Sequence, residues 1–408
     1  MKLAKLSLAA IVVAGLASNS FAADTLADAF KNGKVNGELK AYYFANEDDK
    51  NDKDSIFTTG AMLSYKTAPL YGFTLGLTAQ GAASPFADNG AKDDYRGSMY
   101  GSGAVLSESY IAYSLGKTTA MVGRMFLDTP LVSGSGSRVI KEAFEGAAII
   151  NTDLPNTTLI AGYVQKFQAR TDRNGNAGKF TRKNVTTNSS VNVDINDGAY
   201  TLAAINKSIP GLTLTGAYAY AEAFDVIDIN IGYVEALYEG KAGDIGYTLG
   251  LQDYYNSFNN AGTTDDSINV YAVKAGVSYK GINGTVAFSQ VSDDIVVGNA
   301  VASGLGNGAD LLYTDPVIAM NGYNRDTKSY LLDLNYDLTA AANIGARYVL
   351  ADGYVLSSAV SNKVSSTAVY GSYKFEGALK GFSLKAEYED QGKDADSRDL
   401  WVKANYKF

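Results

Sequence analysis

The sequence contains no cysteine and no histidine, and these two absences narrow the chemistry that the protein can perform. Without cysteine there are no disulfide bonds, so an exported chain must depend on a packed core or a closed hydrogen-bonded ladder for its stability. There is also no Ser–His or Cys–His nucleophile pair, and the usual ligands of a zinc site are missing. Acidic pairs or an activated lysine remain as formal catalysts, but no spacing singles one out. We therefore predict no enzymatic activity, no catalytic residue, no cofactor and no metal.

Long apolar runs are absent beyond the first residues of the chain. The basic segment Met1–Lys5 is followed by the apolar segment Leu6–Ala17 and by a small-x-small pattern at residues 20–22. This order predicts a secretory signal peptide over residues 1–22 rather than a membrane-spanning helix. No later run approaches the ~20 apolar residues that a spanning helix needs. The mature chain is expected to be exported, either as a soluble protein or as a β-barrel.

The composition is poor in proline, with 6 residues, and rich in glycine (42) and tyrosine (29). Such a composition suits paired strands with tight turns and aromatic belts, although a soluble all-β protein could share it. The formal net charge is −8, and removal of Lys2 and Lys5 with the signal peptide brings it to −10. This acidic balance argues against nucleic acid as a partner.

The most informative pattern lies in residues 400–408, because side chains alternate between the two faces of an extended strand. One face is apolar: Leu400, Val402, Ala404, Tyr406 and Phe408. The other face carries Trp401, Lys403, Asn405 and Lys407. This alternation is expected where one face meets lipid and the other meets water inside a closed barrel, with the terminal aromatic at the membrane interface.

The same alternation recurs along the chain and predicts about 18 strands, each near the ~9–11 residues of a spanning strand. The expected strands are 35–45, 56–66, 71–82, 105–115, 118–125, 142–151, 157–167, 198–207, 211–222, 226–238, 243–256, 269–280, 282–291, 329–337, 343–350, 366–376, 382–390 and 399–408. The stretches around Pro85, 170–197 and 292–328 are long connections, whereas 116–117, 208–211 and 337–342 are short. Long external loops on one rim and short periplasmic turns on the other are typical of a transmembrane β-barrel. We predict an all-β fold, an antiparallel barrel over residues 35–408, preceded by a short periplasmic segment, 23–34.

Several stretches resemble known porins. Thr25–Gly37, followed by Ala41–Phe44, resembles the mature start of epsilonproteobacterial outer-membrane porins. Val122–Leu131, with Ser137-Arg138 and Glu142–Ala147, is similar to the strand–loop–strand segment of the porin D (OprD) family. The final strand, with Tyr406 and Phe408, resembles the C-terminal strand that the barrel assembly machinery of the Gram-negative outer membrane reads.

The resemblance implies an 18-stranded outer-membrane barrel that takes up small solutes passively. It also implies an inward loop after the fifth strand, near residues 126–141, and places Arg138 where that loop narrows the pore. Members of the family are often selective for amino acids or other small carboxylate-bearing compounds. No motif in the sequence selects one substrate.

The alternation also predicts which charges line the lumen, where pore selectivity arises. Five basic residues fall on the lumen face of consecutive strands: Lys40, Arg347, Lys374, Lys385 and Lys403. We hypothesise that they form a basic wall that guides carboxylates past acidic groups of the inward loop, namely Asp128, Glu142 and Glu145. The alternative is a lumen that is simply polar and contains both signs, since Glu38, Glu387 and Glu389 lie on the same wall.

The remaining candidates flank or follow the inward loop. Arg124 and Lys141 are candidate pore-lining residues, and Arg124 could instead pin the loop to the wall. The glycine-rich stretch 133–137 lacks the Gly-Lys-Ser/Thr ending of a phosphate loop and is interpreted as loop. The acidic runs 47–54 and 394–399 either bind divalent ions or are solvated charge; neither has the pattern of an EF-hand.

These patterns predict an outer-membrane porin, a passive diffusion channel for small hydrophilic solutes, and the family resemblance implies that amino acids or small carboxylates are among them. The alternative is a surface-exposed structural or adhesin barrel that acts through its long loops. The expected partners are small solutes, outer-membrane lipid with lipopolysaccharide, and the assembly machinery. The solute, the sign of the ion preference and the choice between monomer and homotrimer remain open.

Overall fold

The computed structural model describes residues 23–47, 53–172, 174–183, 185–186, 192–223, 227–260, 266–296, 299–318, 323–354, 361–393 and 395–408. The predicted signal peptide, residues 1–22, lies outside the described residues. Parts of the two acidic runs, residues 48–52 and 394, lie outside them as well.

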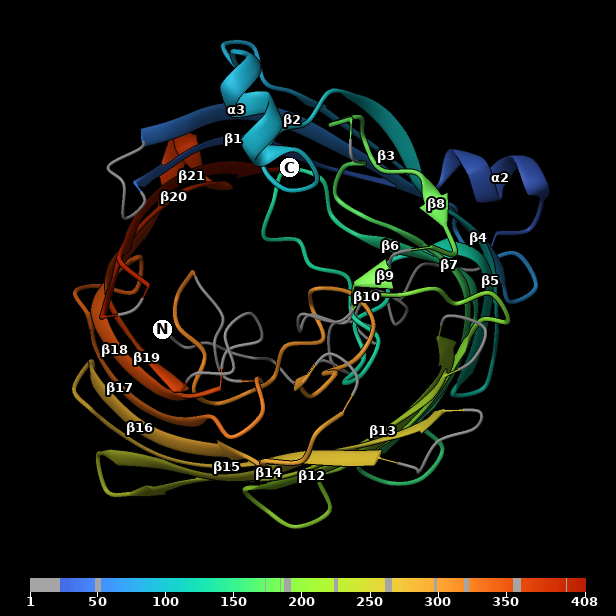
Figure 1. Ribbon diagram of the computed structural model, residues 1–408. Helices are drawn as coiled ribbons and strands as arrows, with labels where there is room; N and C mark the ends of the chain where they lie inside the picture. The colour runs from blue at the N-terminus through green and yellow to red at the C-terminus, as the bar shows by residue number, and fades with distance from the viewer. Residues whose placement is uncertain are drawn as a thin grey trace.

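Within this part of the chain, 18 long antiparallel strands form a closed barrel (Figure 1). In chain order they are β1 (Lys34–Glu47), β2 (Lys53–Lys66), β3 (Phe73–Ala83), β4 (Gly103–Leu115), β5 (Thr118–Met125), β6 (Ala143–Asn151), β7 (Thr157–Gln168), β11 (Ala199–Asn206), β12 (Leu212–Ala223), β13 (Ile227–Ala242), β14 (Ile245–Asn260), β15 (Asp266–Tyr279), β16 (Ile282–Val291), β17 (Lys328–Asp337), β18 (Ala342–Tyr354), β19 (Ser361–Lys374), β20 (Phe382–Lys393) and β21 (Ser397–Lys407). Each strand pairs with its neighbour in the chain, and β21 pairs with β1, where Ala404 lies opposite Ala41. The predicted fold and strand count are confirmed, and the strands differ from the prediction mainly at their loop ends.

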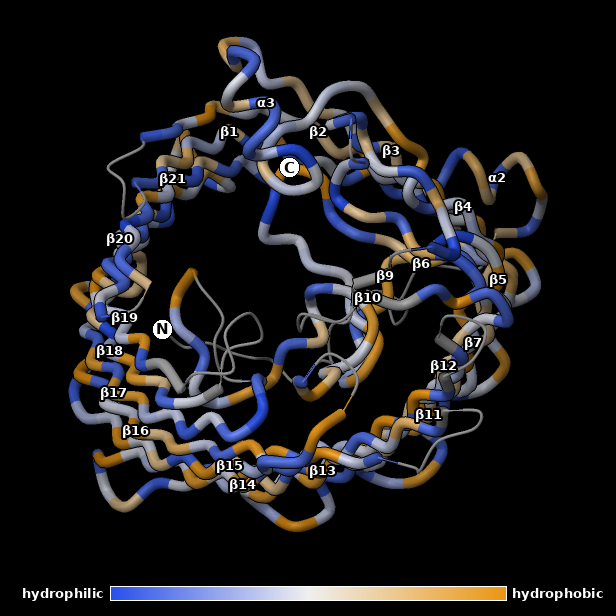
Figure 2. The backbone as a smooth tube through the Cα atoms, viewed as in Figure 1, coloured by the Kyte–Doolittle hydropathy of each residue, from blue (hydrophilic) through white to orange (hydrophobic). Residues whose placement is uncertain are grey.

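The strands have one apolar outer face and one inner face, as the period-two pattern requires. On β21, Leu400 and Val402 keep 37% and 36% of their surface exposed, whereas Trp401 between them keeps 3%. Figure 2 shows the same alternation of hydrophobic and hydrophilic residues along many strands around the barrel. The outer face is therefore apolar over much of its area, as a surface against hydrocarbon must be.

Tight turns join the strands on one rim. Between β15 and β16, Lys280 and Gly281 have φ angles of 46° and 87°. Two consecutive positive φ angles are those of a type I′ turn, whose twist matches that of a two-stranded hairpin. This geometry brings β15 and β16 into register from Tyr279 opposite Ile282 onward.

A few short elements are not among the 18 long strands, although β8 pairs with the end of β7. They are the helices α2 (Leu26–Lys31) and α3 (Asn89–Tyr95), the 3₁₀ helix η2 (Gly377–Leu379), and the short strands β8 (Phe180–Thr181), β9 (Val185–Thr186) and β10 (Asn192–Val193). The Thr25 hydroxyl accepts a hydrogen bond from the Asp28 backbone N–H at 3.1 Å and so caps α2. None of the helices in the described residues is long and apolar enough to cross a membrane.

Two long connections fold into the lumen (Figure 1). The first inward loop, residues 126–142, joins β5 to β6, and its Leu131 and Val132 are fully buried. The second inward loop, residues 292–327, joins β16 to β17, and its Val301 and Ala302 are fully buried as well. Both loops pack against the inner face of the barrel, so the lumen is narrowed by chain and not by wall side chains alone.

Candidate pore constriction

The first inward loop is fixed to the wall at its two sides. On one side, the Gln80 side chain of β3 accepts from the Lys141 backbone N–H at 2.8 Å and donates to the Lys141 carbonyl at 2.9 Å. On the other side, the Lys40 ammonium of β1 donates to the carbonyls of Arg138 and Val139 at 3.3 and 3.2 Å. Because the loop is bonded to both β1 and β3, Arg138 is held in place between them.

The second inward loop is fixed by polar side chains of the opposite wall. The Gln252 amide of β14 donates to the Leu311 carbonyl at 2.9 Å and accepts from the Tyr313 backbone N–H at 2.9 Å. Asn256, which faces the same side of β14, donates to the Ala302 carbonyl and accepts from the Ala302 backbone N–H. Inward-facing amides satisfy the loop backbone where no water competes, which keeps the loop inside the barrel.

Wall charges complete the attachment of the second inward loop. The Glu389 carboxylate of β20 accepts the backbone N–H groups of Val317 and Ile318 at 2.9 and 2.8 Å. Arg347 of β18 donates to the Asp315 carbonyl at 3.0 Å. These two charged residues therefore hold the loop and are not freely presented to the lumen.

The two inward loops bond to each other where they meet. The Leu305 N–H donates to the Leu131 carbonyl at 2.8 Å, and the Ser133 N–H donates to the Leu305 carbonyl at 3.0 Å. The Gly308 N–H donates to the Ser133 carbonyl at 3.0 Å. A β-bridge of this kind couples the positions of two segments that are far apart in the sequence.

Glu142 lies at this junction with no exposed side-chain surface. Its carboxylate accepts the backbone N–H groups of Ser135 and Asn307, each at 2.9 Å, and also accepts from the Asn307 side-chain amide. The Arg170 guanidinium lies 3.4 Å away. A fully buried carboxylate with three hydrogen-bond donors and one ion-pair partner is a structural junction, so Glu142 does not present its charge to a passing solute.

A cluster of cations and one indole lies where the first inward loop meets the wall. The Arg138 guanidinium carbon lies 4.2 Å from the Trp401 ring centroid, and the Lys403 ammonium lies 3.1 Å from it. Lys403 is also 2.7 Å from the Glu387 carboxylate, which bonds Lys385 with its other oxygen. On β1, Lys40 is 3.8 Å from Glu38.

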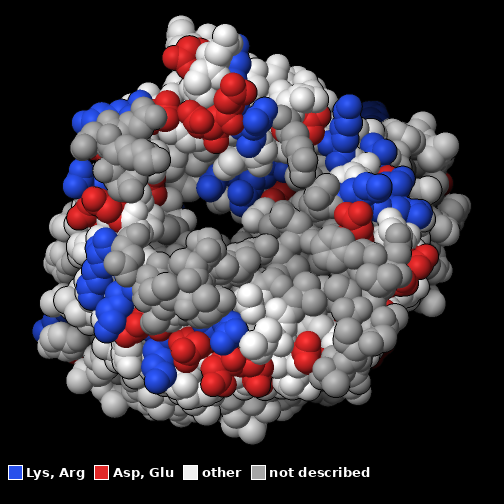
Figure 3. Space-filling model, in the orientation of Figure 1, with Lys and Arg blue, Asp and Glu red and all other residues white. Residues whose placement is uncertain are grey.

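The charges of this cluster do not balance. Four basic residues, Lys40, Arg138, Lys385 and Lys403, lie beside two acidic residues, Glu38 and Glu387. With Arg170, Glu142 and Asp399, whose charges also act on Arg138, the group has five cations and four carboxylates. In the space-filling view, lysine and arginine atoms gather beside the opening that remains in the lumen (Figure 3). The constriction therefore carries a local positive charge, although the chain as a whole is acidic.

Arg138 is the residue in this cluster with no ion pair to a carboxylate of the described residues. Its polar partners are two hydroxyls: Nε donates to Ser98 at 3.3 Å, and Nη1 donates to Ser137 at 3.2 Å. Burial, and then the charge of Arg170, lowers the pKa of Arg138 to about 9, so it is still protonated at neutral pH. A guanidinium has five N–H donors, so several remain for a solute.

The structure brings together part of the predicted basic wall. Lys40, Lys385 and Lys403 lie near Arg138, as the strand order β20–β21–β1 requires. Arg347 instead pairs with Asp333 at 2.9 Å. Lys374 ends β19 at the short turn and is exposed there.

The candidates near the ends of the first inward loop have separate partners. Arg124 lies 3.0 Å from Glu145, which also contacts Lys166 at 2.5 Å. Asp128 accepts from the Ser133 hydroxyl at 2.9 Å within the loop. Burial lowers the pKa of Lys141, whose ammonium lies 4.4 Å from the Phe126 ring centroid.

Sequence reasoning missed two features of the site. The second inward loop was predicted only as a long connection, although its apolar residues 300–302 and 311–312 are unusual for a solvated loop and could have indicated burial. Trp401 was placed on the lumen face but was not proposed as a site residue. It is the one tryptophan of the chain and lies on the face predicted to meet water, and this unusual placement could have indicated a site residue.

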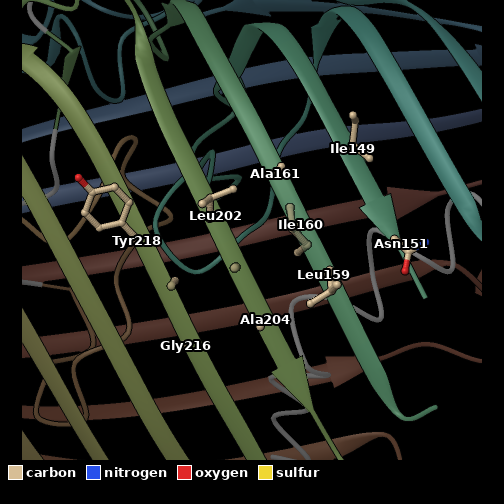
Figure 4. A pocket seen from close by; sticks show the side chains of 11 residues that line it. Ile149, Asn151, Leu159, Ile160, Ala161, Leu202, Ala204, Gly216 and Tyr218 are labelled. Atoms are coloured by element: carbon tan, nitrogen blue, oxygen red, sulfur yellow. The ribbon is translucent and has the colours of Figure 1, made fainter. Parts of the chain in front are cut away.

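The outer surface has apolar hollows, one of them over β17–β20 and another over β6, β7, β11 and β12. Figure 4 shows an apolar groove over β6, β7, β11 and β12, where Gly216 and Ala204 leave a gap between larger side chains. Ile149, Leu202 and Tyr218 at its edges are exposed on the outer face. The groove is therefore part of the apolar outer face of the barrel.

The comparisons with known proteins agree with this architecture. The model of a family described as outer membrane porin, OprD family, matches residues 28–399. Acinetobacter baumannii OccAB2 is 16% identical over 93% of this chain and 99% of its own, with a TM-score of 0.78. Acinetobacter baumannii OccAB4 is 19% identical over 92% and 98%, with a TM-score of 0.74. Pseudomonas aeruginosa OpdK, solved with vanillate, is 14% identical over 93% and 99%, with a TM-score of 0.77. No curated protein sequence matches the chain.

Proposed function

Because the chain belongs to the OprD family of outer membrane porins, which are passive channels for small solutes and not enzymes, we propose that its pore prefers small solutes that carry a carboxylate. The protein is located in the outer membrane of a Gram-negative cell, where its closed 18-strand barrel spans the lipid. Transport through such a channel follows the gradient of the solute. The proposal concerns which solutes pass most readily.

The observation that carries the proposal is the unpaired charge of Arg138. A wall cation that is paired with a carboxylate contributes little net field to a permeating ion, whereas an unpaired one contributes a full unit charge. Arg138 is held by Ser98 and Ser137, which are neutral, and together with Lys40, Lys385 and Lys403 it outnumbers the carboxylates of Glu38 and Glu387 that pair with these lysines. A planar guanidinium with free donors also matches the geometry of a carboxylate.

One similar structure supports the same class of solute. Pseudomonas aeruginosa OpdK was solved with vanillate, which is a carboxylate. At 14% identity the likeness itself concerns the fold, so the support for this chain comes from its own cluster around Arg138.

We propose roles for the other predicted residues on the same basis. Lys40, Lys385 and Lys403 add positive potential beside Arg138, while Lys141 contributes from the first inward loop near residues 126–141. Arg124, Asp128 and Glu145 act at the base of that loop, Arg347 and Glu142 hold the inward loops, and Lys374 acts only at the rim.

We also propose roles for the two ends of the chain. We propose that residues 1–22 direct export and that 23–34 form a periplasmic segment. The Phe408 backbone bonds Gly37 of β1 at 2.9 and 3.1 Å, and the Tyr406 and Phe408 rings are stacked on the outer side. We propose these two aromatics as the signal for the assembly machinery. We also propose that the barrel contacts lipopolysaccharide and forms a homotrimer.

Ion selectivity in planar bilayers tests the function. The wild-type barrel is expected to conduct steadily and to prefer chloride over potassium in a salt gradient. Arg138→Gln should lower that preference about fivefold, the factor that a unit charge exerts at about 4 Å in water.

Lys374→Gln is the matched control, because it removes the same charge from the rim. An unchanged preference in Arg138→Gln, or a wild-type preference for potassium, contradicts the proposal. A barrel that inserts but does not conduct would favour the alternative of an adhesin.

A further inference from the structure

Trp401 lies at the centre of the basic cluster. It is the single tryptophan of the chain and is 3% exposed on the lumen side of β21. Both Arg138 and Lys403 lie over its ring, at 4.2 and 3.1 Å from the centroid. The first of these contacts joins the inward loop to the barrel wall.

The indole is itself held by aromatic packing. The rings of Tyr42 and Phe44, both on β1, meet it edge to face, with centroids 6.3 and 5.8 Å away and interplanar angles of 84° in each case. The indole N–H is buried and has no hydrogen-bond partner in the described residues. The position of the ring is therefore determined by packing, and the β21–β1 closure of the barrel sets where the ring stands.

The nature of this contact matters for the charge at the constriction. A carboxylate could hold Arg138 equally firmly, but the pair would have no net charge. The face of an indole attracts a cation through its quadrupole and leaves the positive charge intact. The two other partners of Arg138, the hydroxyls of Ser98 and Ser137, are neutral as well.

We propose that Trp401 is a positioning residue for selectivity, which holds the Arg138 guanidinium at the constriction without neutralising it. This inference rests on the proposed preference for carboxylates. It adds that the preference depends on the aromatic face of Trp401 and not on the size of the side chain. It also predicts that Arg138 and Trp401 act as one unit.

The test compares four variants with the wild type in liposomes. Uptake of benzoate is measured against uptake of benzamide, which has nearly the same size and no charge. Arg138→Gln and Trp401→Leu should each lower the benzoate-to-benzamide ratio, by about fivefold for loss of a unit charge near the solute. Trp401→Phe, which keeps an aromatic face, should retain most of the ratio. The double variant Arg138→Gln/Trp401→Leu should lose no more than Arg138→Gln alone.

The outcomes distinguish a failure of the proposed carboxylate preference from a failure of the role of Trp401. If Arg138→Gln keeps the wild-type ratio, the proposed function fails. If Arg138→Gln lowers the ratio but Trp401→Leu retains it, only the role of Trp401 is overturned. A Trp401→Leu ratio that falls together with that of Trp401→Phe also overturns it, because the aromatic face would then not be the determinant.

A second measurement leaves Trp401 in place and so does not depend on a variant that could fail to fold. As the one tryptophan, it reports its surroundings through its fluorescence. Iodide should quench the wild type more strongly than it quenches Arg138→Gln, because the guanidinium draws anions to the ring. The neutral quencher acrylamide should not show this decrease. Equal iodide quenching in the two proteins overturns the proposal that an unneutralised Arg138 stands at the ring.

Discussion

Asn307 binds Glu142 with both its backbone N–H and its side-chain amide, although the two residues are 165 positions apart in the sequence. Glu142 ends the first inward loop, and Asn307 lies in the middle of the second. The carboxylate has no exposed surface, so it depends on these donors and on Arg170 for its stability. This pair adds to the backbone hydrogen bonds of Leu131 and Ser133 with Leu305, which also join the two inward loops.

Replacement of Glu142 by Gln should weaken this contact between the two inward loops. The variant has one acceptor oxygen instead of two and brings an amide group up against the amide of Asn307. Breaking a buried ionic contact of this kind typically costs about 3–5 kcal/mol. We expect a larger single-channel conductance and more open-channel noise, measured in planar bilayers at fixed voltage.

Glu145→Gln serves as the control, because Glu145 bonds Arg124 and Lys166 on the wall and does not contact the second loop. Asn307→Ala should reproduce the effect of Glu142→Gln, and the double variant should add little to either change. Quiet, unchanged currents in both single variants would show that the loops do not need this contact.

The predicted basic wall separates into residues that hold loops and residues that present charge. Arg347 is paired with Asp333 and bonds the Asp315 carbonyl, whereas Lys403 lies beside Trp401 and Arg138. Lys403→Glu should therefore shift the reversal potential in a salt gradient strongly toward cation preference. Arg347→Glu, placed next to Asp333, should mainly change conductance and noise by releasing the second inward loop. Equal shifts of reversal potential in the two variants would contradict this division.

The barrel could be predicted from the sequence because lipid imposes a simple rule on it. Each spanning strand must place apolar residues outward at every second position, as Leu400 and Val402 do, and must satisfy all its backbone groups by pairing. The rule acts on every strand separately, so it can be read without knowing the neighbours. The inner position of Lys403 and Lys40 follows from the same phase.

The lumen could not be predicted in the same way, because its contacts depend on loops without a period. Nothing in the spacing of Glu142 and Asn307 indicates that they meet, and the phase of Arg347 does not reveal Asp333 as its partner. The same limit applies to Trp401, whose inward direction follows from the alternation but whose contact with Arg138 does not. The phase of a strand gives the direction of a side chain, and only the tertiary structure gives its partner.

Selectivity should weaken with salt, because the surplus charge around Arg138 acts through water in the lumen. The screening length falls from about 10 Å at 0.1 M to about 3 Å at 1 M ionic strength. With the concentration ratio across the bilayer held constant, the reversal potential should approach zero as both solutions become more concentrated. A potential that stays constant over this range would place the selectivity in steric fit and not in charge.

The chloride preference should also decrease with increasing pH, because Lys141 loses its positive charge. Burial lowers its pKa from the usual lysine value, while the carboxylates of Asp128 and Glu108 oppose the shift. The ammonium therefore loses its proton, and the pore loses a positive charge, at a lower pH than for an exposed lysine with a pKa near 10.4.

Between pH 7 and pH 10 the chloride preference of the wild type should decrease, because Lys141 and also Arg138, whose pKa burial lowers to about 9, lose positive charge in this range. Lys141→Gln should start about twofold lower at pH 7, the effect of a unit charge some 8 Å from the ion in water, and should decrease less. Lys117→Gln, in the exposed turn between β4 and β5, is the control and should follow the wild type. Parallel pH profiles for Lys141→Gln and the wild type would mean that this ammonium does not titrate in the pore within that range.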